Sequence, residues 1–205
     1  MCSSSRVTSV SRETQERLAC YEHLLRRWNQ SINLVSPRSL EQFRSRHLLD
    51  SLQLLQLIPD TAETWVDLGS GGGLPALPIA IVAAEKIPHL HLTLVESDRR
   101  KAVFLETVIR ETGITSKVLV SRAEHLPPLH ADVVSARALA ELGTLLKLLY
   151  THGHGSSIGL FPKGRSVDAE LGQIEGMWKF NLETVASRTD PTGVILKIGD
   201  LSRES

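Results

Sequence analysis

Cysteine is scarce in this sequence, which has only Cys2 and Cys20 among its 205 residues. Two cysteines, one of them beside the first residue, argue against a disulfide framework and a cysteine-based metal site, so we expect a reducing compartment and no metal. Long apolar runs are also missing. The segment from Met1 to Arg6 has no apolar signal core, and no later run approaches the ~20 apolar residues of a membrane helix. We therefore expect a cytoplasmic protein without membrane contact.

An excess of either charge is missing as well, because 23 Lys and Arg residues balance 23 Asp and Glu residues. The chain as a whole has no attraction for nucleic acid, so an RNA contact must come from a local basic patch. The composition, 41% apolar and 22% charged, is that of a globular protein. We expect a monomer that forms one structural unit, in which a helical extension (residues 1–60) packs on a core domain (residues 61–205).

The first sixty residues carry helical patterns. From Glu13 to about Asn29 the apolar residues recur at steps of three and four, which predicts an amphipathic helix. Ser39 is a candidate N-cap because Gln42 follows three residues later, and this predicts a second helix that runs to about Leu57.

After residue 60, short β-type runs alternate with helical stretches. The expected strands cover residues 64–68, 91–95, 117–120, 132–135 and 158–161, and the expected helices cover 75–85, 98–111, 140–150 and 167–178. This alternation predicts a doubly wound α/β fold with a mostly parallel sheet. Two last runs, 182–186 and 194–198, flank a turn at residues 190–193, which predicts a C-terminal antiparallel hairpin.

The strongest chemical signal is the stretch WVDLGSGGGLP at residues 65–75, a buried strand that enters a glycine-rich turn before a helix. Glycines permit positive φ and let a ligand approach the backbone closely. A nicotinamide site would need a third glycine where this chain has Leu74. Asp67 followed by Gly69, Gly71 and Gly73 instead resembles the order in class I S-adenosylmethionine (SAM)-dependent methyltransferases, which have Rossmann-like folds. A purely structural turn or another nucleotide site stays open.

Polar residues also follow the next strands. Glu96 ends the second strand, where a carboxylate can accept both ribose hydroxyls. Asp98 is more simply a helix N-cap. The basic run from Arg99 to Lys101 is either a solvated helix face or an RNA contact.

Candidate ligand-binding residues also follow the third and fourth strands. Ala123 and Glu124 follow the third strand, where methyltransferases commonly hold adenine. Arg137 follows the fourth strand at the edge where open α/β sheets bind ligands, although it could instead pair with a surface acid.

Taken together, several motifs resemble those of the bacterial small-subunit ribosomal RNA guanine-N7 methyltransferases, a family once called glucose-inhibited division protein B. The motifs are Trp28-Asn29, Ile32-Asn33-Leu34, Arg46-His47-Leu48-Leu49-Asp50-Ser51, VDLGSGGGLP at 66–75, Arg122-Ala123-Glu124, Ser135-Ala136-Arg137-Ala138 and Lys163-Gly164. Their order and spacing are more specific than any glycine turn.

The resemblance implies methylation of guanine N7 in 16S rRNA, at position 527, with naked RNA or a small-subunit particle as partner. It implies SAM as cofactor, bound by Asp67, Gly69, Gly71, Gly73, Leu74, Glu96, Ala123, Glu124 and Arg137. It also implies that RNA is contacted by Arg46, His47, Arg122 and Lys163. No general base is implied, and Arg137 and Lys163 would act by positioning.

Alternatives remain at the level of sequence. His47 could be a packed structural histidine with Asp50 as its partner. The enzyme could be a methyltransferase of a small molecule or protein, and a non-catalytic RNA-binding module on the same fold would lack SAM binding. A nicotinamide oxidoreductase is opposed by Leu74.

Overall fold

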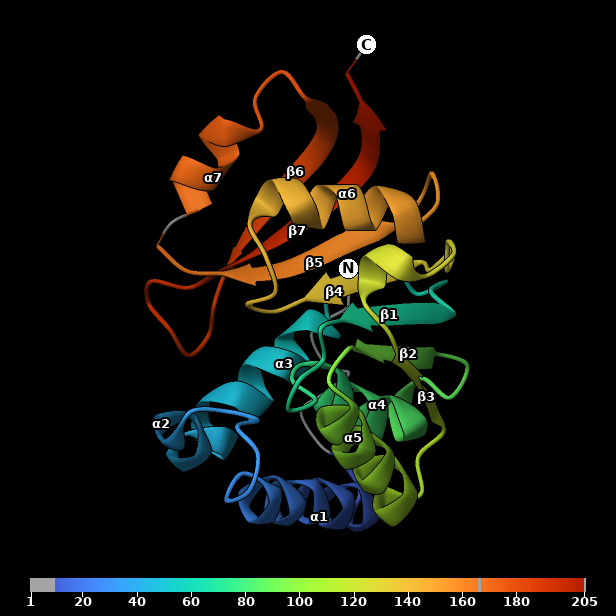
Figure 1. Cartoon of the computed structure of the whole chain (residues 1–205), viewed down its shortest axis with the longest axis vertical. Helices are drawn as coiled ribbons and strands as arrows, with labels where there is room; N and C mark the ends of the chain where they lie inside the picture. Colours follow the sequence, from blue (N-terminus) through green and yellow to red (C-terminus); the bar gives the residue numbers. More distant parts are fainter. Residues whose placement is uncertain (1–9, 166, 205) are drawn as a thin grey trace.

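The computed structural model describes residues 10–165 and 167–204, which are built around a seven-stranded sheet (Figure 1). Its strands are β1 (Thr64–Leu68), β2 (His91–Glu96), β3 (Ser116–Val120), β4 (Val133–Ala136), β5 (Ile158–Lys163), β6 (Trp178–Ala186) and β7 (Val194–Arg203). Their order is β3-β2-β1-β4-β5-β7-β6. The first five are parallel, and β7 lies antiparallel between β5 and β6. The expected doubly wound α/β fold is confirmed.

Alternating side chains of the strands divide the core into two layers. Trp65 and Val133 contribute to an apolar cluster with α4 (Ala76–Lys86) and α5 (Arg99–Thr112), whereas Val66 and Val134 pack with α6 (Leu142–His152) on the other face. Each residue step along a strand changes the face, so both faces of this central sheet must be covered by helices.

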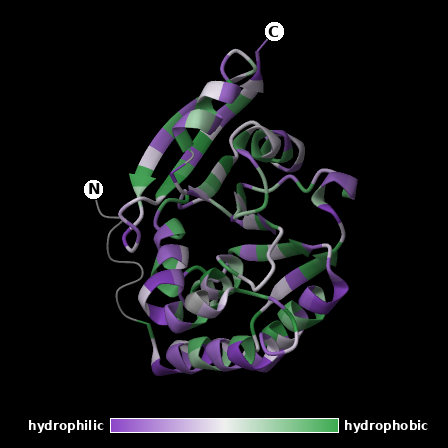
Figure 2. Ribbon diagram, turned by 60° about the vertical axis from the view of Figure 1, so that its left-hand side comes forward, coloured by the Kyte–Doolittle hydropathy of each residue, from purple (hydrophilic) through white to green (hydrophobic). Residues whose placement is uncertain are grey.

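The N-terminal segment packs on the first of these layers. Its long helix α1 (Arg12–Trp28) begins at the N-cap Ser11 and contacts α4 and α5. Figure 2 shows this helix, at the bottom of the view, as largely purple, because its outer residues are hydrophilic. Its buried residues, which include Tyr21 and Leu25, join the same apolar cluster as the sheet.

The second N-terminal helix differs from expectation. It is divided into α2 (Pro37–Glu41), a π-helical segment η1 (Phe43–Leu48) and α3 (Leu49–Leu54). Ser39 is therefore wrong as an N-cap, because α2 already begins at Pro37, a residue whose fixed φ suits a first helical turn. The π-helical turn lies where Arg46 and His47 stand, and such turns are frequent at functional sites.

The C-terminal hairpin is longer than expected. The helix α7 (Val167–Gln173) ends before Gly176, which has a φ of +73°, so the chain turns and enters β6 at Trp178. The expected continuation of the helix to Trp178 is wrong, because Gly176 takes a left-handed conformation that other residues rarely adopt. The turn at residues 190–193 does join the two antiparallel strands.

Other outcomes concern the ends of the chain and the helices. Cys2 and the segment from Met1 to Arg6 lie outside the described residues. In the described ranges, no helix is both long enough and apolar enough to span a lipid bilayer.

Candidate active site

The glycine-rich turn joins β1 to α4 with three glycines at positive φ, Gly69, Gly71 and Gly73. A Cβ on Gly73 would lie 2.2 Å from Leu77 Cδ1, and one on Gly69 would lie 2.6 Å from Leu139 Cδ1. Both positions need glycine for their conformation, and Gly73 needs it also for space, because Leu77 is fully buried. The turn thus presents half-buried backbone without side chains, at Gly69 and Gly71, at the carboxyl edge of the sheet.

The fourth glycine of the turn, Gly72, is explained by the N-terminal segment. A Cβ there would lie 3.2 Å from the Leu34 carbonyl oxygen and 3.1 Å from Val35 Cγ1. The buried Tyr21 hydroxyl donates a 2.6 Å hydrogen bond to the Gly72 carbonyl. Asn29 Oδ1 accepts from the backbone N–H groups of Leu34 and Val35, each at 2.9 Å, and so shapes the loop that packs on the turn. The helical extension therefore supports the turn directly.

Asp67 lies under the turn as a buried carboxylate. Trp65 Nε1 donates to Ser135 Oγ at 2.8 Å, and Ser135 Oγ donates to Asp67 Oδ1 at 2.6 Å. Asp67 Oδ2 is buried without a hydrogen-bond partner. Burial raises the pKa of Asp67 to about 6, against the opposing effects of the Ser135 and Ser70 hydrogen bonds and the Arg137 charge. A buried carboxylate oxygen without a partner suits a ligand with a cationic hydrogen-bond donor, such as the ammonium group of SAM.

Glu96 is fixed at the end of β2 by two backbone donors. Its Oε2 accepts from Gly71 N and its Oε1 from Asp98 N, both at 2.8 Å. These bonds leave lone pairs on both oxygens, so the side chain can still accept ribose hydroxyls. Asp98 Oδ1 accepts from Arg100 N and Lys101 N at the start of α5, which confirms Asp98 as an N-cap.

A first hollow, named here the glycine-turn cavity, has a volume of about 40 Å³. It is lined by Gly69, Val95, Ser97, Ser121, Arg122, Ala123, Glu124 and Leu139. The predicted adenine residues Ala123 and Glu124 thus meet the glycine turn. Nε2 of the buried His152 lies 3.0 Å from the Ala123 carbonyl oxygen. This contact holds the short 3-10 segment η2 (Ala123–His125) against α6. Arg122 belongs to this cavity and lies apart from the other residues predicted to face RNA.

A second hollow, named here the hairpin cavity, has a volume of about 210 Å³ and lies between the N-terminal helices, the end of β5 and the hairpin turn. It brings together Arg46, His47 and Lys163 from the predicted RNA residues, and Arg137 from the predicted cofactor residues. Pro75, which follows the glycine turn, lines it too. Arg137 and Pro75 therefore connect this cavity with the cofactor side.

Arg137 and His47 form the central contact of the hairpin cavity, with Arg137 Nη1 2.9 Å from His47 Nδ1. A guanidinium can only donate, so Nδ1 accepts and the imidazole proton sits on Nε2. Burial, followed by the charges of Arg137 and Arg46, lowers the pKa of His47 to about 4. His47 is neutral near pH 7. Its hydrogen-bond partner is Arg137, whereas Asp50 Oδ1 accepts from Ser187 Oγ at 3.0 Å.

The two other cations of the hairpin cavity are paired with carboxylates. Arg46 pairs with Asp190 of the hairpin turn. Lys163 Nζ donates to Glu170 Oε2 at 2.6 Å and to the Ala140 carbonyl at 3.0 Å, and its side chain is only 11% exposed. Glu170 Oε2 also accepts from Leu142 N at the start of α6. The structure therefore holds Lys163 inward, in a network that joins β5, α6 and α7.

The hairpin turn is fastened to α3 by polar contacts. Gln53 Nε2 donates to the Ala186 carbonyl at 2.7 Å, and Gln53 Oε1 accepts from Arg188 N at 3.0 Å. With the Asp50–Ser187 bond, these contacts span more than 130 residues of sequence. The hairpin cavity exists only because both ends of the chain meet there.

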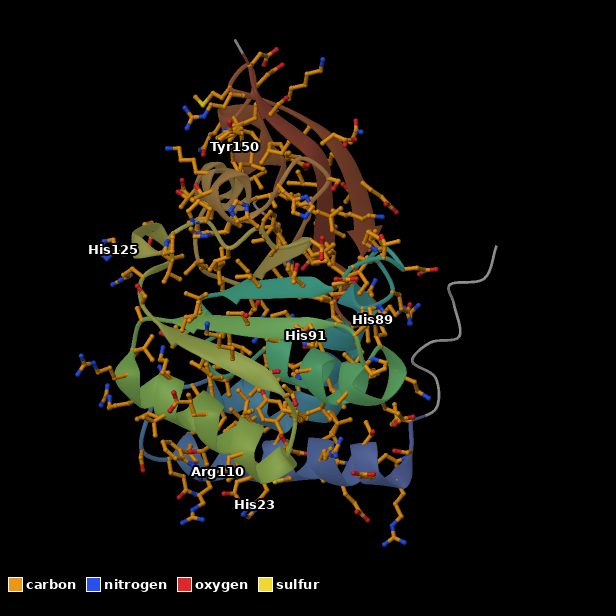
Figure 3. The ribbon with its side chains drawn as sticks, turned by 90° about the vertical axis from the view of Figure 1, so that its right-hand side faces the viewer. His23, His89, His91, Arg110, His125 and Tyr150 are labelled. Atoms are coloured by element: carbon orange, nitrogen blue, oxygen red, sulfur yellow. The ribbon has the colours of Figure 1, made fainter. Side chains whose placement is uncertain are left out.

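Metal-ligating side chains do not gather in the described part of the chain, where no group of three or more His, Cys, Asp or Glu residues could hold an ion. Figure 3 shows His23 and His125 away from each other and from His89 and His91, which lie close together in this view.

Sequence reasoning missed residues that act through tertiary contact. Leu139 lies over Gly69, and only its position directly after the Ser135–Ala138 motif gave any signal. Tyr21 looked like an ordinary apolar position of an amphipathic helix. The acidic partners Asp190 and Glu170 had no sequence signal.

Several solved structures share this fold, and two of them are described as methyltransferases. A SAM-dependent methyltransferase from Aquifex aeolicus has a TM-score of 0.59 at 12% identity, covering 86% of this chain and 97% of that one. A predicted O-methyltransferase from Agrobacterium tumefaciens has a TM-score of 0.57 at 18% identity, covering 78% of this chain and 80% of that one. The fold and its glycine turn are those of class I SAM-dependent methyltransferases.

Sequence comparison gives the family. The model for rRNA small subunit methyltransferase G matches residues 14–190. The ribosomal RNA small subunit methyltransferase G of Ruegeria pomeroyi is 47% identical, covering 95% of each chain, and that of Rhodospirillum centenum is 46% identical, covering 94% of this chain and 87% of the relative. The chain belongs to the rRNA small subunit methyltransferase G family, which confirms the resemblance seen in its motifs. It is a SAM-dependent methyltransferase.

Proposed function

We propose that this protein transfers a methyl group from SAM to N7 of a guanine in small-subunit ribosomal RNA. The observation that carries the proposal is the position of Arg137 and Pro75, which line the hairpin cavity and directly follow β4 and the glycine turn. The glycine turn, with Glu96 bonded to its backbone, suits the cofactor, and the hairpin cavity has space and cations suited to a nucleotide. Family membership supports rRNA as the substrate.

The chemistry of this transfer requires positioning rather than proton removal. Guanine N7 has a lone pair and no proton at neutral pH. When bound, SAM supplies a methyl group that moves to N7 while the electrons of the broken bond stay on sulfur, so the base gains the positive charge and loses no proton. Holding the reactants in line can lower such a barrier by roughly 7 to 11 kcal/mol in favourable cases.

On the cofactor side, Asp67 would accept from the ammonium group and Glu96 from the ribose. Gly69, Gly71, Gly73 and Leu74 would form the backbone cradle, while Ala123 and Glu124 would hold adenine. The unpartnered Asp67 Oδ2 and the two backbone-fixed oxygens of Glu96 support these roles.

On the substrate side, Arg137 would orient the target base at the junction, and His47 would fix the Arg137 guanidinium through Nδ1. The neutral His47 cannot take a proton there, because that nitrogen already accepts from Arg137. Arg46, Lys163 and Arg122 would contact RNA phosphates. For Arg46 and Lys163 this requires sharing or exchange of their present carboxylate partners.

The substrate would be a shaped RNA with its target base unstacked, either free or in a small-subunit particle. A cytoplasmic monomer suits this role, since ribosomal RNA lies in the cytoplasm and both cavities are formed within one chain. We also retain residues 1–60 as a helical extension of the core domain at 61–205, because one apolar cluster contains residues of both segments.

The test is methyl transfer from labelled SAM to small-subunit RNA, naked and in particles, prepared from cells that lack this gene. We expect a single N7-methylguanosine after digestion and mass spectrometry. Binding of SAM without labelling of either RNA would contradict the RNA assignment and point to a small-molecule or protein substrate. Failure to bind SAM would contradict the cofactor site itself.

A further inference from the structure

The charges of the hairpin cavity are unevenly paired. Arg46 is neutralised by Asp190 and Lys163 by Glu170. Asp50 also lines the cavity, but its Oδ1 accepts a hydrogen bond from the neutral hydroxyl of Ser187. In the described lining of the cavity, Asp50 is thus a carboxylate that forms no ion pair. A carboxylate held in this way is free to receive further hydrogen bonds from a ligand.

Asp50 also has a defined position relative to the cofactor side. It belongs to the first turn of α3, whereas Arg137 and Pro75 line the cavity beside the glycine turn. Arg137 is close enough to both Asp50 and Asp67 for their charges to act on it. A base between α3 and the glycine turn would therefore have one edge toward Asp50 and the other toward the cofactor.

The chemistry of guanine matches this arrangement. Its N1–H and N2–H groups are donors on one edge of the ring system, and N7 is an acceptor on the opposite edge. A carboxylate can accept both donors at once, much as it accepts a bidentate guanidinium. Adenine presents a lone pair at N1, which a carboxylate repels. The same contact would select guanine and turn N7 away from α3.

Building on the proposed function, we infer that Asp50 is the residue that recognises guanine, by accepting from N1–H and N2–H of the flipped base. Its negative charge has a second consequence. Methylation at N7 makes the base cationic, so a nearby carboxylate in a partly desolvated cavity interacts more strongly with the transition state than with the neutral base.

The inference is tested with small-subunit RNA assembled to carry either guanine or inosine at the methylated position. Inosine keeps N1–H and N7 but lacks the 2-amino group. We expect the wild-type enzyme to methylate the inosine RNA about 10- to 100-fold more slowly in kcat/KM, the effect of one lost hydrogen bond to a charged group. The Asp50→Ala and Asp50→Asn variants should be slow on guanine RNA and show little further loss on inosine RNA.

The matched control is Gln53→Ala, which removes a contact between the same helix and the same hairpin without removing a carboxylate. It should retain the guanine preference. SAM affinity by calorimetry and RNA affinity by filter binding should stay close to wild type in the Asp50 variants, since the remaining phosphate contacts are intact.

Each failure has a separate signature. Equal wild-type rates on guanine and inosine RNA would overturn the inference without any variant. A guanine preference that survives in Asp50→Ala, or disappears equally in Gln53→Ala, would reduce Asp50 to a structural tie of the hairpin. Absence of N7-methylguanosine with wild-type enzyme on guanine RNA would instead refute the proposed function on which the inference rests.

Discussion

The glycine-turn cavity and the hairpin cavity lie at the same edge of the sheet but are built in different ways. The first is lined by residues at or just after the ends of β1, β2 and β3, such as Gly69, Val95 and Ala123. The second joins the N-terminal helices to the C-terminal hairpin through Arg46–Asp190 and Asp50–Ser187. Parallel strands bring their carboxyl ends together automatically, whereas the second cavity needs long-range polar contacts.

The two cavities therefore differ in how well they tolerate substitutions. A backbone cradle tolerates few substitutions because conformation and space are both fixed. In a cavity made of paired side chains, single substitutions can change which ligand is bound.

The largest effect is expected from Gly73→Ala in the glycine turn. A Cβ at a φ of +82° would strain the backbone and would lie 2.2 Å from Leu77 Cδ1. Strain and overpacking together should lower the free energy of unfolding by about 4 kcal/mol and abolish SAM binding, as measured by urea unfolding and calorimetry.

Gly113→Ala is the matched control for that variant. Gly113 has a φ of +65° but nothing within 4 Å of the added Cβ. It should lose only about 1 kcal/mol and bind SAM normally. Similar SAM affinity in both variants would mean that the glycine turn is not a cofactor cradle.

Lys163→Ala should produce the next largest effect, on the other side of the comparison. It leaves the carboxylate of Glu170 in a partly buried network without the Lys163 ammonium, at a cost of up to about 3 kcal/mol in unfolding free energy. RNA methylation should fall more than SAM affinity does. Equal losses in both would remove Lys163 from the substrate side.

As the pH falls, protonation of Asp67 and of His47 should change the free energy of unfolding in opposite directions. Because the pKa of Asp67 is raised to about 6, the folded protein takes up this proton first as the pH falls, and stability rises between pH 6 and about 4. Because the pKa of His47 is lowered to about 4, the unfolded chain is protonated first. The contribution of His47 to the free energy of unfolding is fully present above about pH 6.5 and is lost as the pH falls toward 4.

Urea unfolding of Asp67→Asn and His47→Asn from about pH 4.5 to 7.5 separates these two contributions. Relative to wild type, Asp67→Asn should lose stability in acid and His47→Asn should gain it, each by on the order of 1–3 kcal/mol. Parallel pH profiles for the wild type and both variants would show that neither group is perturbed as described.

Cofactor binding should depend on the ionisation of Asp67. With a pKa of about 6 and a cationic ligand group beside it, the carboxylate must lose its proton for SAM to bind well. We expect SAM affinity to be about tenfold weaker at pH 5 than at pH 7, by calorimetry. In Asp67→Asn the affinity should be weaker but independent of pH. A wild-type affinity that is constant across this range would place the ammonium group elsewhere.

The smallest effect is expected from Arg122→Ala. Its exposed side chain lines the glycine-turn cavity, so loss of one phosphate contact should weaken RNA binding severalfold and reduce the salt slope by about one, without changing SAM affinity. Arg12→Ala, which changes an exposed pair with Glu16 on α1, is the control. Equal RNA affinity for both variants would leave Arg122 outside the RNA interface.

Much of the cofactor side could be predicted from the sequence, because its signals are local. The strand-turn-helix pattern placed Gly69, Gly71 and Gly73 where the structure has positive φ, and Asp98 was correctly identified as an N-cap. The parallel sheet then brought Glu96 next to Gly71. The extra Gly72 had no explanation from sequence, because its reason is the approach of Leu34 and Val35.

The substrate side was predicted only in part. The motifs singled out Arg46, His47 and Lys163, but not that His47 accepts from Arg137 or that Lys163 is held by Glu170. Those contacts join residues that local patterns cannot relate. The π-helical turn at Arg46 and His47 and the early end of α7 were missed for a similar reason, since tertiary packing and a single glycine conformation overrode the helical pattern.

By itself, the sequence determined the alternation of strands and helices, the glycine turn, the cofactor class and the family, because each depends on local periodicity or on a motif of fixed spacing. Only the tertiary structure decided which charges are paired, which nitrogen of His47 is occupied and which carboxylate faces the hairpin cavity. Those properties arise where α3, β4, β5 and the hairpin turn meet, and their energies depend on burial and distance rather than on neighbours in the chain.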